Sequence, residues 1–137
     1  MRTALDTNVL SALWSDEPSA GGIESVLFNA RSKGGLVICA PVYCELLAYP
    51  SVTRPFVQEF LGETGISVEF VLDEQIWQTA ANAFVAYANR RRRSRGGSPK
   101  RMLVDFVVAA HALLRADQLM TLDASRYQPD FPRLPVI

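Results

Sequence analysis

The stretch LVICAPVYCEL, residues 36–46, decides the fold class of this chain. Its first five residues form an unbroken apolar run, which is typical of a strand buried on both faces. Pro41 follows at once and suits the first position of a helix, because an N–H at that position has no helical partner in any case. A buried strand that passes directly into a helix predicts a parallel sheet with helical connections.

The same alternation continues on both sides of this stretch. Towards the N-terminus, residues 3–5 predict a strand, and Asp6, Thr7 or Asn8 can cap the helix that follows it. Apolar runs predict three further strands towards the C-terminus, over residues 66–72, 119–122 and 134–137. The longer segments between the strands carry apolar residues at helical spacing. The sequence therefore predicts an α/β fold with a parallel sheet that helices cover on both faces.

The length and composition predict one globular domain. The chain has 137 residues, and a domain usually holds roughly 100–200 residues, so we expect a single domain over residues 1–137. Hydrophobic residues make up 49% and charged residues 20%, which excludes a disordered chain. The net charge of zero hides an uneven distribution, since residues 1–89 hold ten acidic and four basic side chains and residues 90–137 hold the reverse. The basic C-terminal part indicates a polyanionic partner.

The cysteines, the histidine and the apolar runs exclude several other classes of protein. Two cysteines and one histidine cannot form a structural zinc site without help from carboxylates. Cys39 and Cys44 lie in apolar runs, so we expect both thiols to be buried in a protein of the reducing cytoplasm. The apolar run over residues 106–114 is far shorter than the ~20 residues that span a bilayer. Because residues 1–10 also lack the apolar core of a secretory signal, we expect a cytoplasmic protein with no membrane partner.

Four acidic residues are predicted to share the edge of the sheet at which the parallel strands end. Asp6 follows the first strand, and Asp123 follows the strand over residues 119–122. Glu45 and Asp105 fall in the first turns of two helices. Ligands of parallel sheets bind at this edge. Carboxylates gathered there repel one another unless a cation neutralises them, and oxygen donors favour Mg²⁺ or Mn²⁺.

Each of these acidic residues also has a local explanation. Asp6 can be a helix cap, Glu45 a solvated helix residue, and Asp123 part of a turn. Asp105 can pair with Arg101, which lies one helical turn earlier. Their joint placement favours the chemical interpretation, in which a metal ion polarises a phosphodiester and activates a water molecule.

A basic segment precedes the helix that carries Asp105. Its seven charged members are Arg90, Arg91, Arg92, Arg93, Arg95, Lys100 and Arg101. Such a segment can hold RNA by phosphate contacts, lie solvated in a flexible loop, or bind an acidic partner. If this segment contacts phosphates beside the metal site, the substrate of the hydrolysis is a nucleic acid.

With these residues identified, the chain resembles the PIN domains, and in particular the VapC-like toxin ribonucleases of bacterial toxin–antitoxin pairs. The similarity rests on LDTNVL at residues 5–10, DFVVAAHAL at residues 105–113 and TLD at residues 121–123. It implies a three-layer α/β/α sandwich with a central parallel sheet of about five strands. It also implies a site for Mg²⁺ or Mn²⁺ with supporting polar groups. The matching acidic positions are Asp6, Glu45, Asp105 and Asp123, and the supporting positions are Asn8 and Thr121.

The resemblance further implies an endoribonuclease that acts as a toxin, cleaves tRNA or rRNA, forms a homodimer and is silenced by a cognate antitoxin. The chain departs from the family pattern at Ala40 and Pro41, where a serine or threonine cap is usual before the helix that bears the glutamate. The alternative function is a PIN-like module that binds RNA or a protein partner without catalysis.

Two other enzyme classes with a similar fold fit the residues less well. A haloacid-dehalogenase-like phosphatase needs a second aspartate two positions after the first, where this chain has Asn8. A receiver domain needs a lysine late in the chain, and the sequence has no lysine after residues 119–122.

Overall fold

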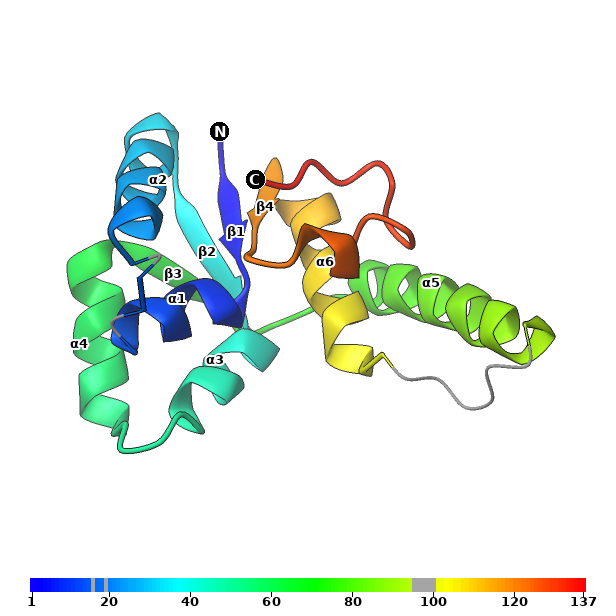
Figure 1. The fold of residues 1–137 in the computed structure, drawn as a ribbon, viewed down its shortest axis with the longest axis horizontal. Coiled ribbons are helices and arrows are strands. Elements are labelled where there is room, and N and C mark those ends of the chain that lie inside the picture. Colours follow the sequence, from blue (N-terminus) through cyan, green and yellow to red (C-terminus); the bar gives the residue numbers. More distant parts are fainter. Residues whose placement is uncertain (16, 19, 95–100) are drawn as a thin grey trace.

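A parallel sheet lies at the centre of the computed structural model, which describes residues 1–15, 17, 18, 20–94 and 101–137 (Figure 1). Its strands within that part of the chain are β1 (Thr3–Leu5), β2 (Leu36–Cys39), β3 (Ile66–Glu69) and β4 (Gln118–Met120). They are ordered β3-β2-β1-β4, and every pair is parallel. The parallel register brings the carboxyl ends of all of these strands to one edge, as the sequence predicts.

Helices cover both faces of the sheet. Their bounds are α1 (Thr7–Trp14), α2 (Ala20–Lys33), α3 (Ala40–Leu47), α4 (Arg54–Thr64), α5 (Glu74–Arg93) and α6 (Leu103–Arg115), with a short 3₁₀ helix, η1 (Ala124–Arg126). Figure 1 shows α2 and α4 on one side of the strands and α5 and α6 on the other. The architecture is therefore the three-layer α/β/α arrangement that the sequence predicts.

Local signals explain where several helices begin and end. Asp73 caps α5, because its Oδ1 accepts a hydrogen bond from the Ile76 N–H at 3.1 Å. Helix α4 ends at Gly65, whose φ of 71° lies in the left-handed region that glycine adopts without strain. Helix α3 has Pro41 in its first turn and Cys39 at its N-cap, with no side-chain hydrogen bond to the cap position. Helix α3 therefore begins without a side-chain cap, as Ala40 and Pro41 in the sequence predict.

The core lies between the sheet and the helices on each side. Every residue of β1 and β2 is buried, as the unbroken apolar run at residues 36–40 predicts for β2. Helix α6 packs against α5 and against the sheet, and its residues 106–112 are all buried. Because α6 is fixed by this packing, its first turn, which carries Asp105, is held at the carboxyl edge of the sheet.

The structure corrects three sequence-based expectations. The fifth strand, expected at residues 134–137, is reduced to an isolated parallel bridge between Val136 and Leu119. Pro135 has no N–H to donate, so this segment cannot form a continuous ladder with β4. Strand β3 ends at Glu69, three residues earlier than expected, because its partner β2 ends at Cys39, which pairs with Glu69.

The third correction concerns the thiols. Cys39 is buried on β2, and burial raises the pKa of its thiol to about 11, so it stays protonated at neutral pH. Cys44 on α3 is exposed instead of buried. Within the described residues, no helix combines the length and the apolar character that crossing a bilayer requires.

Candidate metal centre and apolar groove

Asp6 is the best-anchored acidic residue at the carboxyl edge of the sheet. It follows β1, and its backbone N–H donates to the carbonyl of Met120 at the end of β4. Oδ1 accepts from the Thr7 N–H at 2.8 Å, which makes Asp6 the N-cap of α1. Oδ2 accepts from the hydroxyls of Thr121 at 2.9 Å and Tyr127 at 2.6 Å. Only 5% of Asp6 is exposed, so these donors replace the water that a buried carboxylate loses.

Asn8 and Thr121 tie the ends of β1 and β4 together. The Asn8 amide donates to Thr121 Oγ1 at 3.3 Å, and Asn8 Oδ1 accepts from the Leu122 N–H at 3.1 Å. Thr121 Oγ1 also accepts from the Asp123 N–H at 3.1 Å while its hydroxyl donates to Asp6. Of the two supporting positions that the resemblance implies, Thr121 contacts both neighbouring acidic residues, and Asn8 contacts Thr121 and the backbone of Leu122.

The other predicted acidic residues line one open pocket beside Asp6. The residues that line it are Glu45, Arg101, Met102, Val104, Asp105, Asp123 and Arg126. Glu45 is held by Thr7, whose hydroxyl donates to its Oε1 at 2.6 Å. Because Thr7 follows Asp6 directly, this bond places Glu45 next to the end of β1. Carboxylates that follow β1 and β4 thus lie at the same edge of the sheet as those of α3 and α6.

Burial and several nearby charges shift the pKa of the Asp105 carboxyl group. Its side chain is only 20% exposed, and this burial raises the pKa of its carboxyl group. The guanidinium of Arg126 opposes that rise, while the negative charges of Asp6 and Glu45 add to it. These charges are felt at Asp105 because all of them lie close to the same pocket.

Arg126 is the residue of this site that the sequence reasoning missed. Its Nε lies 3.4 Å from Asp123 Oδ2, and its NH1 lies 3.8 Å from Asp105 Oδ1. The sequence left a pair between Asp105 and Arg101 open as a local alternative, but Arg101 donates instead to the carbonyl of Ser125 at 3.2 Å. The available signal was the spacing of three residues between Asp123 and Arg126, which brings the two side chains together on the turn of η1.

The donor set of the pocket suits a hard divalent cation. Glu45, Asp105 and Asp123 offer carboxylate oxygens, which Mg²⁺ and Mn²⁺ prefer over softer ligands. In the part of the chain that the structure describes, no three acidic, histidine or cysteine side chains stand close enough together to hold an ion. The carboxylates therefore fit such a cation by their chemistry, but in this arrangement the Arg126 guanidinium lies between two of them.

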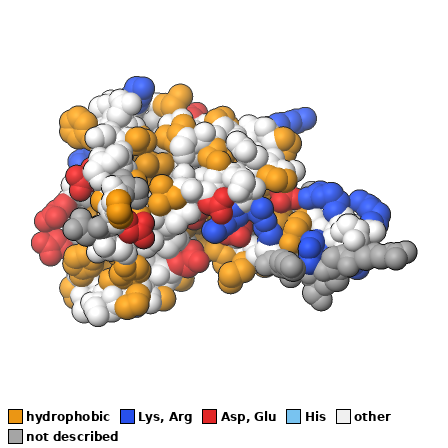
Figure 2. Space-filling model, viewed as in Figure 1, with side chains coloured by type: hydrophobic (Ala, Val, Ile, Leu, Met, Phe, Trp, Pro, Cys, Tyr) orange, Lys and Arg blue, Asp and Glu red, His pale blue; other side chains and the backbone are white. Residues whose placement is uncertain are grey.

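The basic segment lies beyond this pocket, at the end of α5. Figure 2 shows Lys and Arg side chains gathered over that end of the molecule. Arg90 forms an ion pair with Asp130, and Arg92 donates to Asn89, while Arg92 and Arg93 are both exposed. Arg91, at the same turn, is half-buried. Arg95 and Lys100 lie outside the described residues.

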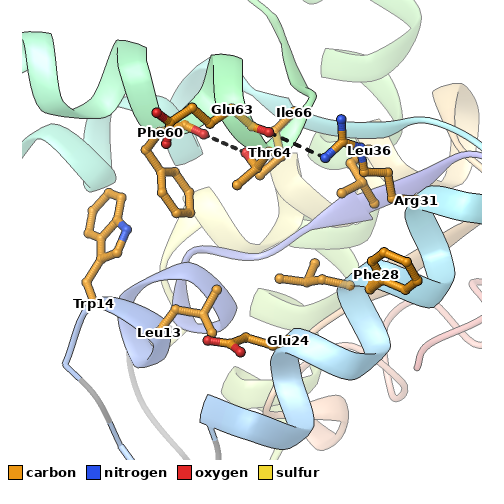
Figure 3. Close-up of a pocket in the computed structure, with 11 residues that line it drawn as sticks. Leu13, Trp14, Glu24, Phe28, Arg31, Leu36, Phe60, Glu63, Thr64 and Ile66 are labelled. Atoms are coloured by element: carbon orange, nitrogen blue, oxygen red, sulfur yellow. Dashed lines mark hydrogen bonds between the residues drawn. The ribbon is translucent and has the colours of Figure 1, made fainter.

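An apolar groove occupies the opposite side of the sheet, among α1, α2 and α4 (Figure 3). Trp14 forms one wall and packs edge-on against Phe60, with ring centroids 5.2 Å apart. Its indole N–H is shielded from solvent and has no hydrogen-bond partner among the residues that the structure describes. Phe28 forms part of the α2 side and is 77% exposed, which is unusual for so large an apolar side chain. The groove is a tertiary feature of three helices, and no local motif predicts it.

Comparisons with known proteins agree with the fold. Among solved structures, a chain of VapBC-1 from nontypeable Haemophilus influenzae is 24% identical with a TM-score of 0.68, and the match covers 100% of this chain and 97% of that one. A chain of VapBC2 from Rickettsia felis, bound to a DNA fragment from its promoter, is 17% identical with a TM-score of 0.69, and the match covers 100% of this chain and 98% of that one. A chain of a toxin–antitoxin complex from Klebsiella pneumoniae is 19% identical with a TM-score of 0.61, and the match covers 98% of this chain and 95% of that one.

Sequence comparison gives the family. No curated protein matches the chain. The family model of the PIN domain, however, matches residues 3–132, a range that contains every described element from β1 to η1. This range also includes all four acidic residues of the candidate metal centre. The chain therefore belongs to the PIN domain family.

Proposed function

We propose that this chain is an endoribonuclease that depends on Mg²⁺ or Mn²⁺, and that it acts as the toxin of a toxin–antitoxin pair by hydrolysing phosphodiesters in tRNA or rRNA. The observation that carries the proposal is the pocket that Glu45, Asp105 and Asp123 line beside the buried Asp6. PIN domains are generally nucleases, and a cluster of carboxylates at the carboxyl edge of a parallel sheet suits that chemistry.

In this proposal the four carboxylates hold the cation, and the neighbouring groups hold the carboxylates. When bound, the cation supplies an activated water molecule and neutralises charge on the phosphodiester and on the leaving oxygen. Thr121 and Tyr127 fix the direction of the Asp6 carboxylate through their hydroxyl groups. Thr7 does the same for Glu45, so a neighbouring hydroxyl group holds each of these two carboxylates before a cation binds.

The basic segment supplies the contacts to the RNA backbone in this proposal. Arg92 and Arg93 are exposed on the last turn of α5, where their charges can reach phosphates. Arg101 belongs to the same proposed interface and also lines the acidic pocket. The remaining proposed RNA contacts are Arg90, Arg91, Arg95 and Lys100.

Cleavage of RNA in the presence of a divalent cation tests the proposal. We expect the purified chain to cut RNA with Mn²⁺ or Mg²⁺, to stop when EDTA is added in excess, and to resume when the cation is restored. Gel electrophoresis of end-labelled tRNA and rRNA measures each step. RNA that is bound but left intact with every divalent cation would favour the alternative, a PIN-like module that binds RNA or a protein partner without catalysis.

The proposal also covers the extent of the domain, its location in the cell, its oligomeric state and its protein partner. We propose a single domain over residues 1–137 that works in the cytoplasm as a homodimer and is silenced by a cognate antitoxin. The similar chain from Klebsiella pneumoniae comes from a toxin–antitoxin complex. The gene for the antitoxin would be a small open reading frame beside the gene for this chain.

The apolar groove is the surface that we propose for the antitoxin. Replacing Phe28 with aspartate should weaken the complex at least about tenfold, because an exposed aromatic anchor in an apolar groove contributes strongly to binding. Co-expression with the product of the neighbouring reading frame, followed by calorimetric titration of the purified proteins, measures the change. Val85→Asp is the matched control, since Val85 is 55% exposed on α5, away from the groove. Equal losses in the two variants would remove the groove from the interface.

A further inference from the structure

Arg126 places a permanent positive charge where the proposed cation would bind. Its guanidinium faces Asp123 Oδ2 at 3.4 Å from Nε and Asp105 Oδ1 at 3.8 Å from NH1. A guanidinium cannot lose its proton in a protein, so this charge is present at every working pH. Because 39% of the Arg126 side chain is exposed, it has room to move towards solvent.

The carboxylates need such a charge when no metal ion is present. Asp105 is half-buried and lies close to the negative charges of Asp6 and Glu45, which repel its carboxylate. The guanidinium of Arg126 counteracts them from within the same pocket. Arg101, the other arginine of the pocket, is held by its hydrogen bond to the Ser125 carbonyl. Among the residues that the structure describes, Arg126 is therefore the cation that forms ion pairs with Asp105 and Asp123.

A divalent ion and this guanidinium cannot share the same carboxylate oxygens. Binding of the ion to Asp105 and Asp123 brings two positive groups to within a few ångströms of each other, which is unfavourable in a partly buried pocket. An ion that binds these oxygens therefore displaces the side chain of Arg126, and the loss of its contacts to Asp105 and Asp123 opposes metal binding.

We propose that Arg126 is a tethered internal cation that competes with the divalent ion for Asp105 and Asp123. The inference rests on the metal site proposed above. In this role Arg126 lowers the affinity of the site for the metal ion. In the metal-free pocket its charge neutralises part of the negative charge, so the carboxylates repel one another less. The opposite role, in which Arg126 holds the carboxylates ready for the ion, predicts the opposite effect of its removal.

Calorimetric titration with Mn²⁺ in the absence of RNA distinguishes these roles. Removing the charge in Arg126→Gln should tighten Mn²⁺ binding about fivefold, the size expected when a partly exposed ion pair no longer competes. Arg133→Gln is the matched control, because it removes an exposed arginine that does not line the acidic pocket. Unchanged or weaker binding in Arg126→Gln, or equal tightening in the control, would overturn the inference.

A second measurement follows the displacement directly in the unaltered protein. Nuclear magnetic resonance of the arginine Nε–H groups, titrated with Mg²⁺, should show the Arg126 signal moving with the midpoint of metal binding, and the spectrum of Arg126→Gln assigns that signal. A signal that stays in place at saturating Mg²⁺ would overturn the inference. If Asp105→Asn abolishes Mn²⁺ binding while Arg126→Gln leaves it unchanged, only the inference fails; if the unaltered chain binds no Mn²⁺, the proposed metal site fails with it.

Discussion

Replacing Asp105 with asparagine should lower the rate of RNA cleavage by at least about a hundredfold, because neutralising one carboxylate removes several kcal/mol of metal-assisted stabilisation of the transition state. The amide keeps the shape of the side chain but removes its charge from the pocket. Single-turnover cleavage of labelled RNA with Mn²⁺ measures the loss. Overexpression of the variant should permit growth if the unaltered chain stops it.

The same substitution should leave the fold intact. The contact between Asp105 and Arg126 is 3.8 Å long and partly exposed, so it contributes little to stability. An acidic residue in the first turn of a helix adds roughly 0.3–1 kcal/mol through the helix dipole. Burial raises the pKa of Asp105, so its charge also costs stability at neutral pH, and because the two effects oppose each other we expect little change in urea unfolding. Asp6 is a less suitable target, because its substitution would also disturb the hydrogen bonds to Thr121 and Tyr127.

The other end of α6 provides the matched control for Asp105→Asn. Asp117 lies just beyond the last turn of this helix, is exposed, and accepts a hydrogen bond from the Arg2 N–H that asparagine can also accept. Asp117→Asn should therefore cleave RNA at the original rate. Full cleavage, or full toxicity, in Asp105→Asn would contradict the role proposed for this carboxylate.

The gathering of the acidic residues was predictable because it follows from strand direction. Once residues 36–40 indicate a buried parallel strand, the same rule places the residues after β1 and β4 at a common edge. Asp6 and Asp123 occupy those positions. The helix cap expected at Asp6 is observed: Oδ1 caps α1, while Oδ2 accepts hydrogen bonds from Thr121 and Tyr127.

The features that the sequence did not predict depend on contacts between distant segments. Arg126 reaches Asp105 only because η1 turns back towards the start of α6, and no local pattern fixes that turn. The groove lined by Trp14 and Phe28 requires three helices to be placed relative to one another. The segment around Val136 has the apolar composition of a strand, but Pro135 interrupts its pairing. Tertiary placement therefore decides the first two features, whereas the third follows from Pro135, which the sequence itself contains.

Replacing Arg92 and Arg93 together with glutamine should weaken RNA binding at least about tenfold at ~0.1 M salt, because each arginine that contacts a phosphate releases counterions on binding. The slope of log affinity against log salt concentration should fall by about 1.4, the value for two phosphate contacts on a single strand. Both side chains are exposed on α5, so the fold should not change. Filter binding or fluorescence anisotropy across a salt series, with Asp105→Asn as the background to prevent cleavage, measures both quantities.

The double variant needs a control that removes the same charge elsewhere. Lys33 and Arg54 are exposed on α2 and α4, on the side of the sheet opposite to α5. Replacing both with glutamine also lowers the net charge by two, so any general loss of attraction between protein and RNA appears in both double variants. A loss confined to Arg92 and Arg93 assigns the end of α5 to the RNA interface. If the salt slope changes equally in both, or in neither, RNA does not contact the end of α5, and the basic segment must serve a different partner.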